Sequence, residues 1–596
     1  MNQALVHRGP DEGSVDVFGP CVLGHRRLRV IDLDTGSQPV SDESGDVVCV
    51  FNGELYNFPE LRAELHDHQV RGTGDTPVIP HLYEEHGLAF VERLEGMFAV
   101  ALWDARRRRL VLARDRLGKK PLLWSELPDG TLAFASELKG LLCLPVLSRE
   151  LDPEALDAYL ALQYVPGDRT ALRTVRKLPP GHLLVAEGGS VRIERYWQAE
   201  PREEEHSEAG WLELVRATVR DAVRRRLIAD VPLGALLSGG IDSSVVVALM
   251  SEASSRPVRT FTVGFGEPRY DERPYARAVA ERFGTRHEEL VVEAGAAETL
   301  PRLASAFDEP LGDEAALPLF LICEAARTHV TVALTGDGGD ESFAGYERYA
   351  AHRLAANPTL RIAPARLLRR LGSHDPRSTP NRAARLVETA KAPAPERYGH
   401  LMEIFPRALR ADLWNPDFVT PAPTSDVLGL PRAPGTTGLQ LLDVETYLPG
   451  DLLLKADIAS MASSLELRSP LLDHHVVELG LSLPDSLKLR GRRGKQGLRR
   501  AFAHELPPQV AGRGKTGFGV PLASWFRGEL RELAADLLLD ERARSRGQLR
   551  PATVKRLLHE HVSGRTDHGH RLWCLVMLEL WQRTYVDTPV STLAAA

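Results

Sequence analysis

The stretch that most constrains this chain is LGALLSGGIDSSVVVALM, residues 233–250. An apolar run predicts a strand, a Ser-Gly-Gly turn at 238–240 ends it, and Asp-Ser-Ser at 242–244 opens a helix. Glycines let the backbone approach a ligand closely, and the free N–H groups at a helix N-terminus attract phosphate. A plain strand, turn and helix with Ser and Asp as caps is the simpler alternative. The complete string favours a phosphate-binding loop.

The same string matches the pyrophosphate loop of the ATP pyrophosphatase superfamily, in which ATP is cleaved between its α and β phosphates. It differs from the Walker pattern G-x-x-x-x-G-K-[ST], which the sequence lacks. The expected product is therefore an acyl-adenylate. An aspartate beside the loop would hold a magnesium ion on the phosphate rather than bind the phosphate itself.

A second glycine-rich loop lies in VTVALTGDGGDE, residues 330–341. It also follows an apolar run, and it carries Asp337, Asp340 and Glu341. Ligands of an open parallel sheet bind beyond the carboxyl ends of its strands, so we expect both loops to face one crevice. Three carboxylates in one loop repel one another unless a cation or an ammonium group compensates them. An acidic surface turn is the plainer alternative, and it is weak beside the first loop.

The patterns divide the chain into two halves. Up to about residue 200, short β-rich runs separated by turn signals predict an α+β domain of sandwiched antiparallel sheets. Beyond it, apolar runs alternate with helical patterns, which indicates an α/β domain with a buried parallel sheet, and a mostly helical part follows. We predict domains at 1–200 and 210–586, an acidic linker at 201–209 and an unpacked tail at 587–596.

Composition excludes several classes of protein. At 596 residues the chain is too long for one hydrophobic core. Its 74 Lys and Arg face 81 Asp and Glu, so it lacks the basic excess of a nucleic-acid-binding surface. No apolar run is long enough to cross a bilayer, and the start shows no signal-peptide pattern. We expect a cytoplasmic protein with no nucleic-acid or membrane partner.

The cysteines and three of the lysines need separate interpretations. Five widely spaced cysteines without a C-x-x-C motif indicate neither a disulfide framework nor a zinc site. Lys455, Lys495 and Lys515 are each surface residues by default. A cation near the phosphates is nonetheless what adenylate formation and amide attack require, because negative charge develops at the transition state.

Taken together, the motifs resemble the glutamine-dependent asparagine synthetase family of the class B type, over nearly the whole chain. The series is specific for the family and less so for the substrate, because relatives that close β-lactams or macrolactams share it. The motifs, in the family's order and spacing, are HRGPDEG, LGHRRLRVIDL, FNGELYN, GMFAVALWD, ARDRLGKKPL, SGGIDSS, DEPLGDEAALP, TGDGGDE and GFGVPL.

The resemblance implies an N-terminal glutamine amidotransferase domain and a C-terminal synthetase domain, with ammonia passing between them through an internal tunnel. It implies that aspartate or another carboxylate is activated with ATP and Mg²⁺, and that ammonia or glutamine supplies the nitrogen. Whether the chain forms a homodimer stays an open question at this point. The residues that the resemblance assigns to glutamine are Arg27, Leu28, Arg29, Val30, Ile31, Asn52, Gly53, Glu54 and Asp75.

In the synthetase half, the resemblance assigns magnesium to Asp242 and Asp340. Asp337 matches the acidic residue associated with the aspartyl-adenylate, and Lys455 matches the catalytic lysine. The residues that it assigns to ATP are Leu236, Ser238, Gly239, Gly240, Asp242, Ser243, Ser244, Val263, Thr335 and Gly336.

The first residues depart from the family pattern. Its glutaminase uses an N-terminal cysteine whose free α-amine serves as the base, whereas this chain opens with Met1 and Asn2. Cys21 is internal to a predicted strand, so we expect it to pack rather than react. We expect an amidotransferase domain that lacks its first strand, and an ammonia-dependent enzyme without glutamine hydrolysis.

Milder departures leave the acyl substrate open. They are Pro77, the pair Glu314 and Ala315, and Ile458, and the last two lie in the synthetase half. The leading hypothesis is a ligase that forms asparagine from aspartate, and the alternative is an amide- or lactam-forming tailoring enzyme with another acyl substrate. A non-enzymatic relic is disfavoured because acidic and glycine-rich loops are costly without a nucleotide and a metal. The charge balance disfavours a nucleic-acid-modifying relative.

Overall fold

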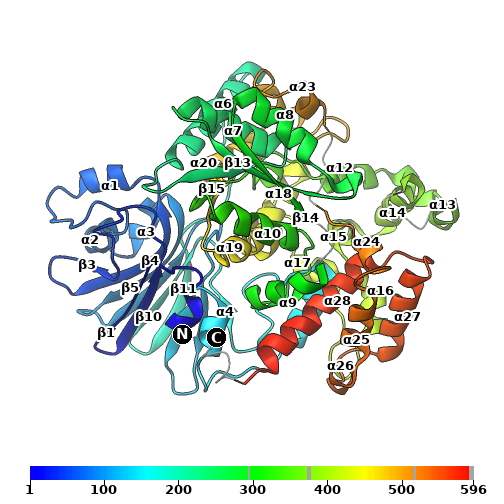
Figure 1. Cartoon of the computed structure of the whole chain (residues 1–596), viewed down its shortest axis with the longest axis horizontal. Helices are drawn as coiled ribbons and strands as arrows, with labels where there is room; N and C mark the ends of the chain where they lie inside the picture. The colour runs from blue at the N-terminus through cyan, green and yellow to red at the C-terminus, as the bar shows by residue number, and fades with distance from the viewer. Residues whose placement is uncertain (293–295, 372–377, 514–518, 590–596) are drawn as a thin grey trace.

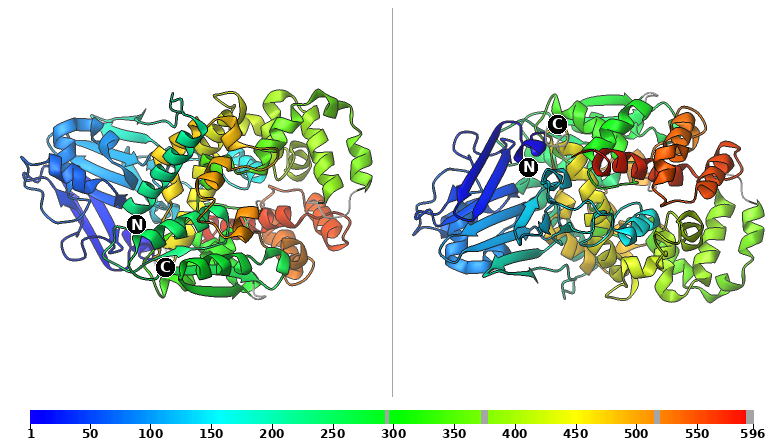
Figure 2. Two further views of the ribbon diagram at one scale, coloured as in Figure 1. Left: turned by 90° about the horizontal axis from the view of Figure 1, so that it is seen from above. Right: turned by 90° about the horizontal axis from the view of Figure 1, so that it is seen from below.

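The computed structural model describes residues 1–292, 296–371, 378–513 and 519–589. Figure 1 shows the strands of the N-terminal part at one end of the molecule and the C-terminal helices at the other, and the two views of Figure 2 agree. The parallel sheet with its helices lies between them. Lys515 and part of the GFGVPL motif lie outside the described residues, as do residues 590–596 of the predicted tail.

A six-stranded antiparallel sheet forms the centre of the N-terminal part. Eight of the nine residues of β5 are buried, because layers of side chains cover both faces of the sheet. The register of β4 and β5 pairs Asn52 with Ala99 and Gly53 with Phe98. The strand order is β11 (Ser190–Arg195), β10 (His182–Glu187), β6 (Arg109–Arg114), β5 (Gly96–Asp104), β4 (Val47–Leu55) and β3 (Val40–Ser41).

Two smaller antiparallel sheets form the second layer. Cys21 and Leu23 of the first small sheet share a hydrophobic core with Val50 and Ala101 of the large sheet. This packing confirms the predicted sandwich. The first small sheet joins β1 (Glu12–Phe18) to β2 (Cys21–Arg27), and the second has the order β8 (Leu132–Ala135), β7 (Leu123–Glu126) and β9 (Arg176–Lys177).

Short helices cover the other face of the large sheet. The first of them, α1, ends at Glu64, because the backbone of Leu65 leaves the helical region. Val78, Ile79 and Leu82 of α2 pack into the hydrophobic core on this face of the large sheet. The helices of this part are α1 (Phe58–Glu64), α2 (Val78–His86), α3 (Phe90–Arg93), α4 (Leu138–Leu142) and α5 (Pro153–Leu162).

A long helix connects the N-terminal part to the parallel sheet. The side chain of Ser207 caps α6 (Glu208–Arg225) by accepting a hydrogen bond from the backbone N–H of Gly210 at 3.2 Å. Residues 208 and 209, which the sequence analysis assigned to the linker, are therefore helical.

The predicted parallel sheet is confirmed. Its apolar strands are buried because α7 (Ile241–Ala253), α8 (Arg273–Phe283) and α10 (Ala316–Arg327) pack against them. The two glycine-rich loops follow β12 and β15, which are neighbours and run in the same direction. The strand order is β14 (Arg286–Val292), β13 (Arg259–Phe265), β12 (Leu233–Leu236), β15 (Val332–Leu334) and β16 (Glu466–Arg468).

The C-terminal helices share a hydrophobic core with α5 of the first 200 residues. The Tyr159 hydroxyl of α5 donates to the carbonyl of Cys574 at 2.8 Å, so the two halves are packed together. Among the described residues, no helix combines the length and apolarity that crossing a membrane requires. The principal helices are α9 (Ala296–Ala306), α12 (Glu347–Ala355), α14 (Thr379–Lys391), α18 (Gly435–Glu445), α19 (Leu453–Met461), α20 (His474–Ser482), α25 (Arg531–Leu539), α27 (Pro551–Val562) and α28 (Gly569–Trp581).

Candidate active site

The first glycine-rich loop joins β12 to α7. Gly239 has a φ of 66°, and a Cβ there would lie 2.5 Å from the backbone of α8, so this position requires glycine. Ser238 Oγ lies 3.1 Å from Ser243 Oγ, and the Ser244 hydroxyl donates to the Gly240 carbonyl at 2.6 Å. These contacts hold the loop at the N-terminus of α7, whose first N–H groups have no carbonyl partner within the helix.

Lys495 joins the aspartates of the two loops. Its Nζ lies 2.8 Å from Asp340 Oδ1 and forms a second, short ion pair with Asp242 Oδ2. Burial opposes the charge on Lys495, but the two carboxylates outweigh it and raise the pKa of the ammonium group. Lys495 is therefore the ammonium partner that the carboxylates of the second loop require.

Asp242 and Asp340 also fit a magnesium ion. Asp242 Oδ1 is buried and receives no hydrogen bond from any described residue. Gly339 leaves room beside this oxygen, since a Cβ there would lie 2.4 Å from it. A buried carboxylate oxygen without a donor is costly, and magnesium prefers such oxygens as ligands.

The second loop positions Asp337 beside this pair of aspartates. The Thr335 hydroxyl donates to Asp337 Oδ2 at 2.7 Å and lies 3.0 Å from Ser469 Oγ. Burial raises the pKa of Asp337, and the neighbouring aspartates raise it further, whereas Thr335 and Lys455 lower it. Asp337 thus shares one electrostatic environment with both the aspartate pair and Lys455.

The two loops are in direct contact. Gly336 lies so close to the first loop that a Cβ there would be 2.5 Å from the backbone nitrogen of Ser243. Leu236 is the last residue of β12, and Val263 is buried on the adjacent β13. All ten residues assigned to ATP therefore lie on two neighbouring strands and the loops and helix that follow β12 and β15.

Lys455 belongs to a second group of buried charges. It lies within α19 and is buried, so the default expectation of a surface lysine is wrong, and its ammonium group pairs with Asp313. Burial opposes the charge of Lys455, but Asp313 and Asp451 raise its pKa. Gln163, from the first 200 residues, donates to Asp451 Oδ2 at 2.7 Å. The N-terminal part therefore contributes to the surroundings of Lys455.

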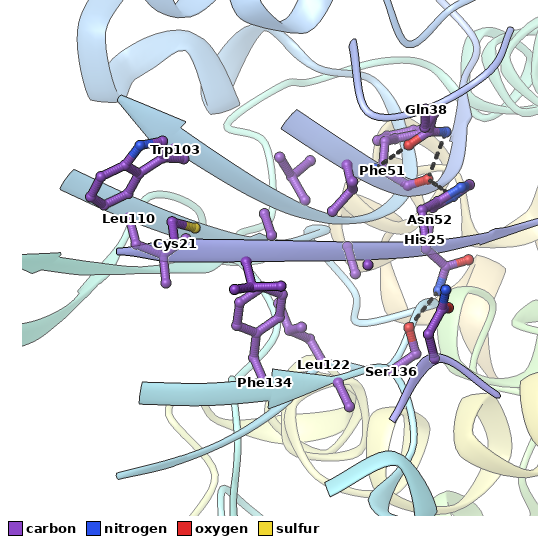
Figure 3. A pocket seen from close by; sticks show the side chains of 18 of the residues that line it. Cys21, His25, Gln38, Phe51, Asn52, Trp103, Leu110, Leu122, Phe134 and Ser136 are labelled. Carbon is purple, nitrogen blue, oxygen red and sulfur yellow. Dashed lines mark hydrogen bonds between the residues drawn. The ribbon is translucent and has the colours of Figure 1, made fainter. Parts of the chain in front are cut away.

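A cavity of about 880 Å³ lies between the layers of the N-terminal sandwich. At its polar end, Asn52 Nδ2 donates to Ser136 Oγ at 3.4 Å, and Gln38 bonds to the backbone of Phe51 (Figure 3). Its other end is apolar, with Leu110 and Phe134 among the lining residues shown in Figure 3. The cavity therefore has one end suited to a polar ligand.

Eight of the nine residues assigned to glutamine line this cavity. The exception is Arg29, whose side chain is exposed and whose backbone N–H donates to Asp11 Oδ2 at 2.9 Å. Met461 and Glu466 line the same cavity, so it extends to the C-terminal half. The eight residues are Arg27, Leu28, Val30, Ile31, Asn52, Gly53, Glu54 and Asp75.

Buried charges determine the electrostatics of the polar end. Arg27 donates to the carbonyls of Asp32 at 2.5 Å and Ile31 at 3.2 Å. Asp75 accepts the backbone N–H of Leu55 at 2.9 Å, and burial raises the pKa of Asp75 to about 6. These groups could bind the carboxylate and the amine of a small zwitterion.

The cysteines are not placed as nucleophiles in this cavity. Of the five, Cys21 alone lines it, in its apolar part, and burial raises the pKa of that thiol to about 11. Burial also raises the pKa of Cys49, Cys323 and Cys574, and Cys143 lies outside the cavity. A thiol that is neutral at physiological pH is a weak nucleophile.

The HRGPDEG motif lies at the contact between the two halves. Arg8 is 5% exposed and pairs with Glu137 Oε1 at 2.6 Å and with Asp457 Oδ2 at 2.7 Å. The His7 carbonyl accepts the Ser464 hydroxyl at 2.6 Å. The motif therefore connects the amidotransferase-like part to the part that carries Lys455.

Two family models match the chain. The model described as "Asparagine synthase" covers residues 214–583, and the model described as "Glutamine amidotransferase domain" covers residues 1–197. The first spans more than half of the 596 residues. The chain belongs to the asparagine synthase family. It is an enzyme of the ligase type, and this family forms amides at the expense of ATP.

Several curated relatives of the asparagine synthase family resemble the chain along most of its length. Asparagine synthetase [glutamine-hydrolyzing] 1 of Bacillus subtilis is 32% identical over 606 residues, which cover 98% of this chain and 93% of the relative. Asparagine synthetase 3 of the same organism is 29% identical over 551 residues, 87% of this chain and 83% of the relative. Amidase chyE of Penicillium rubens is 30% identical over 614 residues, which cover 91% of this chain and 87% of the relative.

The sequence patterns do not indicate every residue of this candidate site. They do not indicate that Asp313 and Asp451 lie beside Lys455, or that Lys495 pairs with Asp242. Asp313 lies inside the quoted motif DEPLGDEAALP, so a signal was present. The pattern could not reveal that these side chains are buried and paired, because their partners lie more than 100 residues away.

Proposed function

We propose that this ligase converts aspartate to asparagine, with ATP as the activating substrate and Mg²⁺ as the cofactor. The observation that supports it best is the buried cluster in which Lys495 pairs with Asp242 and Asp340 beside the two glycine-rich loops. Asp337 and Lys455 adjoin this cluster. Such a set of charges suits a reaction in which a carboxylate attacks a phosphate group of ATP and pyrophosphate leaves, because negative charge develops in its transition state.

In the first step, an oxygen of the aspartate side-chain carboxylate attacks the α phosphorus of ATP. The bond to the bridging oxygen breaks, and pyrophosphate leaves with the electron pair. The N–H groups at the start of α7 and the hydroxyl of Ser238 bind the leaving pyrophosphate. Asp242 and Asp340 would hold the magnesium ion, which would neutralise phosphate charge when bound. Lys495 supplies a further positive charge at the same place.

In the second step, the nitrogen of ammonia attacks the acyl carbon of the adenylate. The acyl C–O bond breaks, AMP leaves, and the nitrogen gives up one proton. Lys455 stabilises the negative oxygen of the tetrahedral intermediate, since its ammonium group stays charged beside Asp313. Asp313 and Asp451 act as positioning residues for Lys455, and the Gln163 bond to Asp451 links this step to the N-terminal half.

We propose ammonia, not glutamine, as the nitrogen source of this 596-residue chain. The support is the position of the cysteines, none of which combines access to the polar end of the cavity with a lowered thiol pKa. The cavity is bordered by Met461 and Glu466, so ammonia entering it would reach the synthetase half. The polar end would still bind glutamine without hydrolysing it.

The test incubates the purified chain with ATP, Mg²⁺, aspartate and either ammonium or glutamine labelled with ¹⁵N in its amide. Ammonium should give equal amounts of pyrophosphate and asparagine, and glutamine should give no labelled asparagine. Labelled asparagine from glutamine would overturn the proposed nitrogen source. Pyrophosphate release with another carboxylate but not with aspartate would favour the amide- or lactam-forming alternative. Absence of pyrophosphate with every carboxylate would overturn the adenylation chemistry.

A further inference from the structure

Four side chains of types that can bind a metal lie together on the N-terminal part, and none of them lines the cavity or pairs with Lys455 or Lys495. Glu43 lies between β3 and β4, and His68 lies in the segment between α1 and α2. His81 and Glu84 lie one turn apart on α2. Each offers one ligand atom, and these atoms all lie within 4.8 Å of one another. Three separate segments of the chain therefore converge on one point.

The distances between the ligand atoms suit a tetrahedral ion. Glu43 Oε1 lies 3.4 Å from His68 Nδ1, and Glu43 Oε2 lies 3.2 Å from His81 Nδ1. Glu84 Oε2 lies 3.8 Å from His68 Nδ1 and 3.7 Å from His81 Nδ1. Metal bonds of about 2.1 Å in tetrahedral directions place the ligand atoms about 3.4 Å apart. The four distances, from 3.2 to 3.8 Å, bracket that separation.

His81 supplies an independent indication of a ligand. The residue is 1% exposed, and its Nδ1 has no hydrogen-bond partner among the described residues. This nitrogen faces two carboxylates, with Glu43 Oε2 at 3.2 Å and Glu84 Oε2 at 3.7 Å. A buried imidazole nitrogen that faces carboxylates is a common type of ligand for a transition metal.

The surrounding groups also favour a cation. His68 Nε2 lies 2.9 Å from Glu85 Oε1, and such a carboxylate commonly orients a metal-bound imidazole. Asp42, the residue before Glu43, adds a further buried carboxylate nearby. Arg106 lies 3.9 Å from Asp42 and is closer to Asp46, at 2.6 Å. A divalent ion would compensate the excess of carboxylates.

We propose that Glu43, His68, His81 and Glu84 bind a divalent transition-metal ion of the zinc class through two imidazole nitrogens and two carboxylate oxygens. The ion would fasten the β3–β4 turn and the segment after α1 to α2. It would thereby brace α2, which begins three residues after Asp75 of the polar cavity. The site is chemically distinct from the all-carboxylate pair proposed for magnesium.

The test titrates the full chain, stripped of metal by a chelator, with Co²⁺ in excess Mg²⁺ and follows visible absorption. One equivalent of Co²⁺ should give the intense bands of a tetrahedral site, and one equivalent of Zn²⁺ should abolish them. His68→Ala and Glu84→Gln should each weaken Co²⁺ binding at least tenfold while ATP-dependent pyrophosphate release is retained. His475→Ala, which changes the other His-containing cluster with Glu95 and His474, is the matched control and should leave the bands unchanged.

Any one of three results would overturn the proposed metal site. The first is an absence of tetrahedral bands at one equivalent of Co²⁺. The second is unchanged bands in both His68→Ala and Glu84→Gln, and the third is their loss in His475→Ala alone. Measuring pyrophosphate release on the same samples separates this outcome from that of the proposed ligase activity, because the two sites share no residue.

Discussion

At the scale of single residues, the candidate chemistry depends on buried lysines that carboxylates keep charged. Lys495 and Lys455 are both nearly inaccessible, and each lies against two aspartates. An unpaired ammonium group would lose its proton on burial, so the carboxylates are what make these residues cations at neutral pH.

Lys495→Met tests the role of this residue. Removing the charge leaves Asp242 and Asp340 repelling each other and removes a cation from the phosphates, so pyrophosphate release should fall at least 100-fold, as for other transition-state cations. Lys555→Met changes an exposed lysine of α27 and should be within twofold of wild type. Equal activity of Lys495→Met and wild type would contradict the assigned role.

His25 predicts a pH dependence of stability. Burial lowers its pKa from 6.5 to about 4, and its Nε2 bonds to the Phe51 carbonyl at 3.1 Å. The unfolded chain therefore binds this proton first, so the stability is present above pH 6.5 and is lost as the pH falls toward 4. At pH 5 the loss is about 2 kcal/mol.

His25→Gln can keep the bond to Phe51 without titrating. The fall in melting temperature between pH 7.5 and pH 5 should therefore be several degrees smaller in His25→Gln than in wild type. His66→Gln, at a side chain that is 77% exposed, should show the wild-type fall. An identical fall in all three proteins would show that His25 is not a neutral buried group.

At the scale of elements, the two strand–loop–helix units create the site, and the sequence predicts them well. A short apolar run followed by glycine and then by Ser or Asp predicts a strand, a ligand-binding loop and the start of a helix. The structure has this arrangement twice, after the neighbouring parallel strands β12 and β15. The position of Lys455 was harder to predict. A π-helical turn at Leu448–Leu452 runs directly into α19, which contains Lys455. This turn contains Pro449, and proline is tolerated in the first turn of a helix but disfavoured in its interior. The sequence therefore gives no clear signal for where this helix begins.

Gly239→Ala tests the first loop as an element. A Cβ at this position would lie 2.5 Å from the backbone of α8, so the loop must shift and ATP-dependent pyrophosphate release should fall at least 100-fold. Gly284→Ala is the matched control, because Gly284 has a similar φ of 62° but nothing within 4 Å of its Cβ position. It should cost about 1 kcal/mol of stability and leave activity intact. Similar activity of the two variants would contradict a structural requirement for glycine in the loop.

At the scale of the whole molecule, the two halves are joined by buried ion pairs that no local pattern predicts. Arg8 bridges Glu137 and Asp457, although more than 120 residues separate Arg8 from Glu137 and more than 440 separate it from Asp457. The HRGPDEG motif was readable as a functional loop, and the family resemblance supplied its domain. Its contact with the synthetase half depends on long-range packing, which only the structure reveals.

Arg8→Met tests this connection. Glu137 keeps its pair with Lys139, and Asp457 keeps its pair with Lys120. Loss of the Arg8 bonds should therefore destabilise the chain by about 2–3 kcal/mol, and the melting temperature should fall by several degrees. Arg106→Met removes an exposed pair with Asp46, and it should change the melting temperature by about 2 °C or less. Equal melting temperatures of the two variants would show that the interface does not depend on Arg8.

Exchange of labelled pyrophosphate into ATP reports directly on the proposed formation of an acyl-adenylate from aspartate. Exchange requires no nitrogen donor, so it isolates the chemistry of the two glycine-rich loops from the N-terminal half. We predict exchange that depends on aspartate and Mg²⁺ and that is lost in Asp242→Asn. Absence of aspartate-dependent exchange in wild type would contradict the formation of an aspartyl-adenylate, and full exchange in Asp242→Asn would contradict the proposed role of Asp242.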